Sequence, residues 1–298
     1  MQQPETLKFL FVINPASGAK ANQNWENIVT EYFKSLPHTC EFFIIENVNA
    51  EVKLQDQIRI SKPDRVVAVG GDGTITMVGK LLLGSTAALC ILPGGSANGM
   101  ARELEIPIEP KQALDVAVNG EVKCADVVKI NEQVCLHLSD IGMNAQLIKY
   151  FEEGKSRGKL GYIKVALKVL RNRQNIQVTI ETSDVEVKRN AFMVVVANAS
   201  KYGFGAVINP EGNLYDGFFE VIIIRRLAIS ELFKMWFRPQ PFNPKKIEVY
   251  HARSVSIETT QKVHFQVDGE YLGKVKKIKA RIVPAQLQIV LPKTSAAE

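Results

Sequence analysis

The stretch VVAVGGDGTITMV, residues 66–78, joins an apolar strand to three glycines placed around one carboxylate. Residues 66–69 show no polar alternation, which is typical of a strand buried on both faces in a parallel α/β sheet. Such sheets bind ligands beyond the carboxyl ends of their strands. Glycines there favour positive φ or close approach to a ligand, and Thr74 is expected to cap a helix whose first N–H groups face an anion. The stretch therefore predicts an anion-binding turn. The alternative is an ordinary tight turn with Asp72 as a capping residue.

The composition is that of a globular protein and limits the classes of partner. The 298 residues are 46% hydrophobic and 23% charged, with a formal net charge of +6. This mild basic bias suits an anionic ligand or an acidic membrane surface and is too weak to indicate a nucleic acid. Residues 7–15 are expected to form a strand rather than a signal peptide, and no apolar run approaches the roughly 20 residues of a membrane span. We therefore expect a cytoplasmic protein whose contact with membranes is peripheral.

The cysteines and histidines are isolated from one another. Their spacing fits neither a disulfide framework nor a zinc site, and the cysteines lie mostly within apolar runs. We therefore expect reduced cysteines and no zinc. These residues are Cys40, Cys90, Cys124, Cys135, His38, His137, His251 and His264.

The hydrophobic periodicity changes near residue 127. Before this point strand-like and helix-like segments alternate, which predicts a Rossmann-like domain with a parallel sheet over residues 1–127. After it, strand-like segments follow one another and predict an antiparallel β-sandwich over residues 128–298, whose last strand could pack back on the first domain. Two helices are expected within the second part, at residues 159–172 and 228–237. The expected strands there include residues 133–142, 175–183, 185–200, 217–226, 246–260, 262–271 and 277–292.

Two further loops share the glycine-rich and hydroxyl-rich chemistry of residues 70–74. The first expected strand ends in NPASGAK, with Asn14 and Ser17, and the strand after VVAV ends in LPGGSANGMAR, with Gly95, Ser96 and Asn98. Neighbouring strands of a parallel sheet would bring the three loops to one edge, where they would form a cradle for a polyphosphate. None of the loops has the GxxxxGK[ST] or GxGxxG pattern. A P-loop ATPase and a dinucleotide dehydrogenase are therefore not favoured.

The order of these motifs resembles the diacylglycerol kinase catalytic domain family, which includes bacterial lipid kinases and sphingoid base kinases. The resemblance implies two domains with nucleotide bound in the cleft between them. It also implies an ATP- and Mg²⁺-dependent kinase that phosphorylates a hydroxyl of diacylglycerol or a sphingoid base at a membrane surface, in lipid and phospholipid metabolism. The motifs that carry it are NPASGAK (14–20), VGGDGT (69–74), LPGGSANGMAR (92–102), NPEGNLYDGFFEVIII (209–224) and VDGEYLG (267–273).

The resemblance also implies roles for individual residues. Asp72 would bind magnesium or the acceptor hydroxyl, and Glu270 would be the general base, meeting Asp72 only across a closed cleft. Taken alone, Glu270 is better explained as a solvated acid after a hairpin turn, because Asp-Gly is good turn chemistry. Asp126 and Asp216 match positions that hold metal in the family. The residues expected to contact nucleotide are Asn14, Ser17, Gly71, Asp72, Gly73, Thr74, Gly95, Ser96 and Asn98.

Three departures from the family pattern leave the acceptor open. Ala19 stands where many bacterial members have lysine, Gly99 replaces an aspartate, and Tyr215 replaces the first of two paired acids. These changes remove charged partners expected to orient the base. Two alternatives are kept: an NAD kinase-like enzyme, which would share the GGDGT motif, and a non-catalytic nucleotide or lipid sensor. A homodimer is also left open.

Overall fold

The computed structural model describes residues 6–17, 23–46, 49–142, 175–202, 205–226, 231, 234–235 and 242–293. The chain divides into two compact units, the first formed by residues 1–125 with 285–298 and the second by residues 126–284. Residues 285–298 belong to the first unit, where the end of strand β16 (Glu270–Leu291) pairs; the sequence allowed for the last strand to pack back on the first domain. The expected helix at 159–172 lies outside the described residues, as does most of 228–237.

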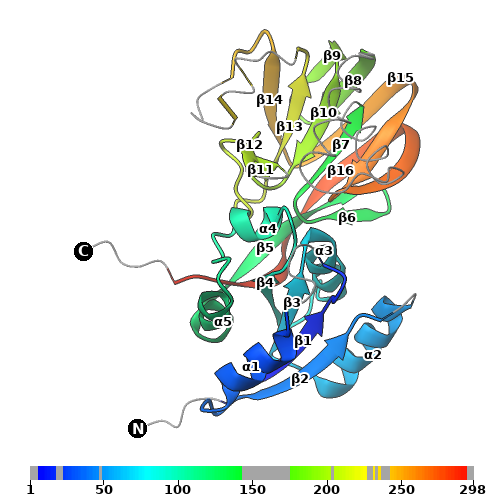
Figure 1. The fold of residues 1–298 in the computed structure, drawn as a ribbon. Helices are drawn as coiled ribbons and strands as arrows, with labels where there is room; N and C mark the ends of the chain where they lie inside the picture. Colours follow the sequence, from blue (N-terminus) through cyan, green and yellow to red (C-terminus); the bar gives the residue numbers. More distant parts are fainter. Residues whose placement is uncertain are drawn as a thin grey trace. The chain divides into compact units, whose positions relative to one another are not determined.

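The first unit is an α/β structure with a parallel sheet (Figure 1). Strand β1 lies between β2 and β3, β4 lies beside β3, and Ile289 of β16 pairs in parallel with Leu89 of β4. The apolar strands at its centre are buried on both faces, as their lack of alternation predicts. The elements are β1 (Lys8–Ile13), α1 (Trp25–Phe33), β2 (Thr39–Ile44), α2 (Ala50–Ser61), β3 (Arg65–Gly70), α3 (Asp72–Leu81), β4 (Ala88–Pro93), α4 (Gly99–Glu103) and α5 (Pro110–Asn119).

Helix α4 is shorter than the helical pattern at residues 97–106 predicts. Its end is set by Glu105, which has a left-handed backbone with φ of 56°. The N–H of Ile106 donates to the carbonyl of Ala101 at 2.8 Å, and that of Glu105 to Arg102. This is the hydrogen-bond pattern of a Schellman-type helix end. The helix begins at Gly99, and Asn98 occupies its N-cap position at the end of the loop that follows β4.

The second unit is built from antiparallel strands. The hydrogen-bonded order runs β14-β13-β10-β7-β15. Strand β15 also pairs with β16 and with β8, and β8 in turn pairs with β9. The remaining pairs are β5 with β6 and β16, and β11 with β12. The strands are β5 (Glu121–Ile130), β6 (Gln133–Cys135), β7 (Leu138–Gly142), β8 (Ile176–Thr182), β9 (Glu186–Ala191), β10 (Met193–Ala197), β11 (Lys201–Tyr202), β12 (Ala206–Val207), β13 (Phe219–Ile224), β14 (Ile247–Ala252) and β15 (Ser254–Val267).

Four of the expected strands are each divided in two, and one of them, residues 262–271, is interrupted by the turn at Asp268 and Gly269 between β15 and β16. Residues 133–142 form β6 and β7, because the intervening N–H groups bond to a side chain instead of a neighbouring strand. Residues 185–200 form β9, which pairs with β8, and β10, which pairs with β7 and β13. Residues 246–260 likewise divide at Arg253 into β14 and β15. A period-2 pattern identifies strand residues but not the point at which the chain changes its partner.

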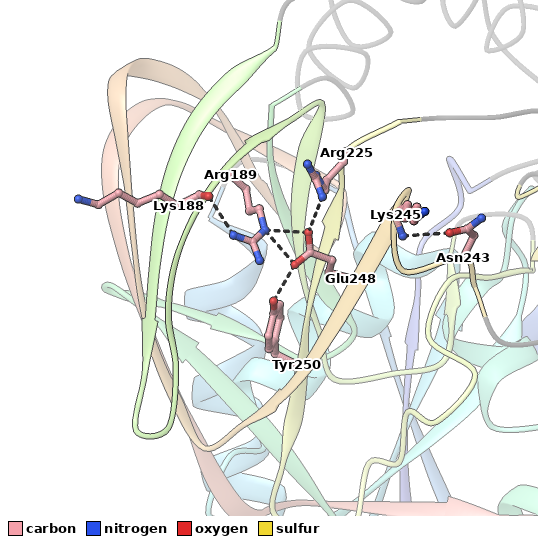
Figure 2. A network of polar contacts seen from close by, with 7 residues as sticks. All are labelled: Lys188, Arg189, Arg225, Asn243, Lys245, Glu248 and Tyr250. Atoms are coloured by element: carbon pink, nitrogen blue, oxygen red, sulfur yellow. Dashed lines mark hydrogen bonds and ion pairs between the residues drawn. The ribbon is translucent and has the colours of Figure 1, made fainter.

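A cluster of charged and polar residues shows how this sheet closes on itself (Figure 2). Arg189 of β9 contacts Glu248 of β14 through Nε at 2.8 and 3.0 Å, although these strands are at opposite ends of the hydrogen-bonded series. Glu248 also accepts hydrogen bonds from Arg225 at 3.2 Å and Tyr250 at 2.7 Å. Burial alone would raise the pKa of Glu248, but these partners outweigh it and hold the pKa below its usual value. The cluster therefore fastens the two ends of the sheet around the apolar core.

Candidate functional site

The loop after β3 leads directly into helix α3, which begins at Asp72 (Figure 1). The expected capping role of Thr74 is therefore wrong: Gly71 occupies the N-cap position and no side chain caps the helix. Thr74 is instead buried in the first turn, where its hydroxyl accepts a hydrogen bond from Asn14 Nδ2 at 3.1 Å. Asn14 follows β1, so this bond joins the loops at the carboxyl ends of two neighbouring strands.

Glycine is required in these loops for close packing rather than for positive φ. No glycine between residues 70 and 95, apart from Gly84, has a positive φ, so the expectation of left-handed backbone in the GGDG turn is wrong. The N–H of Gly94 donates to the carbonyl of Gly70 at 2.8 Å. A Cβ added to Gly95 would lie 2.5 Å from the Cα of Gly71, and one added to Gly70 would lie 3.0 Å from Ser17 Oγ. The three loops predicted to form a cradle thus meet at one edge of the sheet.

Gly73 differs from these packed glycines because the space beside it is open. A Cβ added at Gly73 would meet no heavy atom of the described residues within 4 Å. Gly73 lies in the first turn of α3, where backbone N–H groups have no partner within the helix and favour an anion. The structure therefore offers room for a ligand at the position where the sequence predicts phosphate binding.

Asp72 is tied to the neighbouring loop through one of its two oxygens. Oδ1 accepts a hydrogen bond from the N–H of Met100 at 3.0 Å, while Oδ2 makes no hydrogen bond within the described residues. Asp72 is half-buried at the start of α3. Its carboxylate is therefore held in place and still has one oxygen that could bind a metal ion or a hydroxyl.

Asn98 and Ser96 have different positions in the loop after β4. Asn98 is buried, has a left-handed backbone with φ of 50°, and accepts a hydrogen bond from the N–H of Gly95 at 2.8 Å. Its amide oxygen therefore shapes the loop. Ser96 is exposed at the tip of the same loop. Nucleotide contact by both residues stays a prediction, and Gly18, Ala19 and Lys20 of the loop after β1 lie outside the described residues.

Glu270 lies in the second unit as the first residue of β16. It follows a two-residue hairpin turn in which Asp268 and Gly269 both have positive φ, at 49° and 86°. This is the backbone of a type I′ turn, so the Asp-Gly turn chemistry expected from the sequence is confirmed. The Glu270 side chain is exposed and makes no hydrogen bond or ion pair within the described residues. Its role as a base stays a prediction.

The two aspartates predicted to bind metal lie on adjacent backbone segments. Asp126 is buried, and its Oδ2 accepts a hydrogen bond from the N–H of Gly217 at 2.7 Å. Asp216 is exposed and accepts from the N–H of Phe218 at 2.9 Å. The described part of the chain has no group of three or more His, Cys, Asp or Glu side chains arranged to bind a metal ion. Metal binding at Asp126 and Asp216 therefore stays a prediction.

Sequence reasoning missed a pair of carboxylates around His251 in the second unit. Its Nδ1 is 2.9 Å from Glu220 and its Nε2 is 2.9 Å from Glu211, so both nitrogens can donate only when the ring is protonated. Burial works to lower the pKa of His251, but the two carboxylates outweigh it and raise the pKa. Burial raises the pKa of Glu220, which is 1% exposed. The only signal was a glutamate at an inward-facing position of the apolar run FFEVIII.

A second missed group surrounds the Glu270 hairpin. Ser139, Asp140 and Gln266 are almost fully buried and form hydrogen bonds with one another. The signal was polar residues within HLSDIG and HFQVDG, two stretches otherwise typical of core strands. Their partners are more than 120 residues apart along the chain, so spacing alone could not have paired them.

The first unit combines a parallel α/β sheet with clustered glycine loops, and the second is an antiparallel β structure. Residues 8–130 match the diacylglycerol kinase catalytic domain, and residues 139–291 match the YegS C-terminal NAD kinase beta sandwich-like domain. The chain belongs to the diacylglycerol kinase catalytic domain family with a YegS-like C-terminal domain. The resemblance and the fold class inferred from the sequence are thereby confirmed.

Curated relatives of the chain include bacterial lipid kinases. A diacylglycerol kinase of Bacillus subtilis is 24% identical over 296 residues, covering 96% of this chain and 97% of its own length. One from Staphylococcus saprophyticus is 28% identical, covering 71% of this chain and 72% of its own. A putative diacylglycerol kinase structure from Bacillus anthracis has a TM-score of 0.80 at 22% identity, with 98% of this chain and 99% of that chain covered. The chain is therefore a homologue of lipid kinases.

The same fold extends to another group of kinases. The structure of an NAD kinase from Archaeoglobus fulgidus in complex with ATP has a TM-score of 0.57 at 17% identity, covering 96% of this chain and 94% of that chain. Since fold does not by itself determine substrate, this likeness leaves the acceptor open. Among the described residues, no helix is both long and apolar enough to cross a bilayer.

Proposed function

We propose that this protein is an ATP- and Mg²⁺-dependent kinase that transfers the terminal phosphoryl group of ATP to a hydroxyl of a lipid. The observation that carries the proposal is the meeting of three glycine-rich loops at one sheet edge, with open space beside Gly73 and a carboxylate at Asp72. Phosphoryl transfer depends mainly on positioning and on neutralising charge, which such a cradle can supply.

The residues of the first unit fit a bound nucleoside triphosphate. The first N–H groups of α3 would bind phosphate oxygens, and the exposed hydroxyl of Ser96 would contact the nucleotide. Asn14 and Ser17 would serve the same site from the loop after β1, while Asn98 holds Gly95 in place. When bound, Mg²⁺ neutralises phosphate charge, and it needs only one or two protein carboxylates because phosphates and water complete its shell. Asp72, with one oxygen unused, fits that requirement.

Glu270 would take the proton from the acceptor hydroxyl. Deprotonation of an alcohol by a placed carboxylate contributes about 10² to 10⁴ to the rate of such reactions. Glu270 is exposed and has no competing partner within the described residues, so its carboxylate can accept a proton. In this proposal Asp72 serves the phosphates, directly or through a metal ion, and Glu270 serves the acceptor hydroxyl.

The acceptor we propose is diacylglycerol or a sphingoid base, presented at a membrane surface where the protein works as a peripheral enzyme. The names of the relatives support diacylglycerol. Gly99, at the start of α4, replaces the aspartate of the family pattern and supplies no charge beside the glycine loop, so a sphingoid base is kept as the second lipid acceptor. NAD is a second candidate acceptor because of the fold shared with the archaeal NAD kinase.

The experiment is a transfer assay with γ-labelled ATP and Mg²⁺. Dioleoylglycerol and sphingosine in mixed micelles, and NAD in solution, are offered separately. We expect label on one of the two lipids and none on NAD. Label on NAD alone would replace the lipid kinase with an NAD kinase. ATP binding without transfer to any acceptor would instead support a sensor.

A further inference from the structure

The hairpin that carries Glu270 is fixed by more than its own turn. Asp268 is the first central residue of the turn, and its carboxylate accepts hydrogen bonds from three consecutive backbone N–H groups. The N–H of Leu136 lies 2.8 Å from Oδ2, and those of His137 and Leu138 lie 2.9 and 3.1 Å from Oδ1. The thiol of Cys135 is 3.3 Å from Oδ1. A type I′ turn needs none of these bonds, since Asn-Gly or Gly-Gly would form it equally well.

Gln266 holds the other side of the same turn. It is fully buried, and its Oε1 accepts a hydrogen bond from the N–H of Gly269 at 2.8 Å. Its Nε2 donates to Asp140 Oδ2 at 2.5 Å, and its carbonyl accepts from Ser139 Oγ at 2.6 Å. One central residue of the turn is thus bound through its side chain and the other through its backbone.

Glu270 obtains no such support through its own side chain. Its carboxylate has no hydrogen-bond partner or ion pair within the described residues. The place from which its side chain extends is therefore set by the hairpin backbone that precedes it. In addition, Gly99 and Tyr215 do not supply the acids that the family pattern places at those positions.

We propose that Asp268 and Gln266 are positioning residues that hold the Glu270 carboxylate for catalysis by clamping its hairpin to residues 135–140. This inference rests on the proposed function. The clamp is suited to the task because charge-assisted bonds to three N–H groups fix both distance and orientation. A displacement of about 1 Å at a reacting group can lower a rate on the order of a hundredfold.

The test uses Asp268→Asn, because asparagine tolerates the left-handed backbone and keeps the turn. Its amide nitrogen replaces one acceptor oxygen and faces a backbone N–H group. We expect turnover on dioleoylglycerol to fall on the order of tenfold to a hundredfold, with the KM for ATP unchanged. The matched control is Asp184→Asn in the turn between β8 and β9, where the aspartate is exposed; we expect it to behave as wild type.

A double-mutant cycle separates positioning from a merely structural role. If Asp268 acts through Glu270, the variant Asp268→Asn/Glu270→Gln should be no slower than Glu270→Gln alone. The inference would be overturned if the double variant lost turnover by the product of the two single losses, or if the turnover of Asp268→Asn stayed within about threefold of wild type. If the wild-type protein transfers no phosphate, the proposed function itself fails. This failure can be told from a failure of the positioning role, because it is observed in the wild type before any variant is made.

Discussion

The two units build their predicted sites in opposite ways. In the first unit the loops are shaped by glycines, whose missing side chains let Gly71 and Gly95 approach closely and leave space beside Gly73. In the second unit the Glu270 hairpin is shaped by buried polar side chains, above all Asp268 and Gln266. The first site depends on the absence of side chains at its glycines, and the second depends on hydrogen bonds made by buried side chains.

This difference predicts how each site should respond to mutation. A phosphate cradle made from backbone loses ligand affinity when a side chain is added. A base held by a hydrogen-bonded clamp loses turnover while nucleotide binding is kept.

The largest effect is expected from Glu270→Gln. If Glu270 is the base, turnover should fall by about 10² to 10⁴ while ATP affinity hardly changes, because the side chain meets the acceptor and not the nucleotide. Turnover is measured with labelled ATP and dioleoylglycerol, and affinity by calorimetry. The matched control is Glu186→Gln, also an exposed acid at the first residue of a strand after a hairpin turn. Equal turnover in both variants would leave Asp72 as the only candidate base.

Asp72→Asn should lower phosphoryl transfer on the order of a hundredfold or more, because it removes a charge used for metal or proton binding. The amide oxygen can still accept the hydrogen bond from Met100, so the melting temperature should stay close to that of wild type. Melting and transfer are measured on the same preparation. Activity within about threefold of wild type, at unchanged melting, would remove Asp72 from the site.

The smallest effect is a pH dependence of stability from His251 and Glu220. Both have a pKa raised above the ordinary values of 6.5 and 4.5. A raised pKa in the folded state gives stability that is complete below the ordinary value and is lost as pH rises through the raised one. The melting temperature should therefore fall as the pH rises above 6.5, the ordinary pKa of histidine, and fall less in His251→Gln. The same slope in both proteins would contradict the assignment.

The sequence was sufficient to predict the elements whose signals are local. Apolar runs without alternation identified β3 and β4, and the glycine loops identified the site edge of the first unit. The change of periodicity placed the switch from parallel to antiparallel strands. These signals depend on residues that are neighbours in the chain, so one sequence can carry them.

The features that could not be predicted depend on long-range contacts. The division of residues 133–142 follows from Asp268, more than 120 residues away. The positive φ expected at the GGDG turn was wrong because close packing of two loops explains the glycines equally well in a sequence. The sequence allowed for the last strand to pack back on the first domain, but its pairing with β4 is encoded by no local pattern.

The most direct test of the phosphate cradle is ATP binding by Gly73→Ala, measured by calorimetry beside the melting temperature. The added Cβ meets no atom in the part of the chain that the structure describes, and alanine is preferred to glycine within a helix by about 0.5–1 kcal/mol, so the fold should be as stable or more stable. In Gly95→Ala, by contrast, the Cβ would lie 2.5 Å from the Cα of Gly71 and should lower stability as well. We predict that Gly73→Ala binds ATP at least about tenfold more weakly at unchanged or raised melting temperature. Wild-type affinity in this variant would contradict the account, because it would show that no phosphate lies beside the first turn of α3.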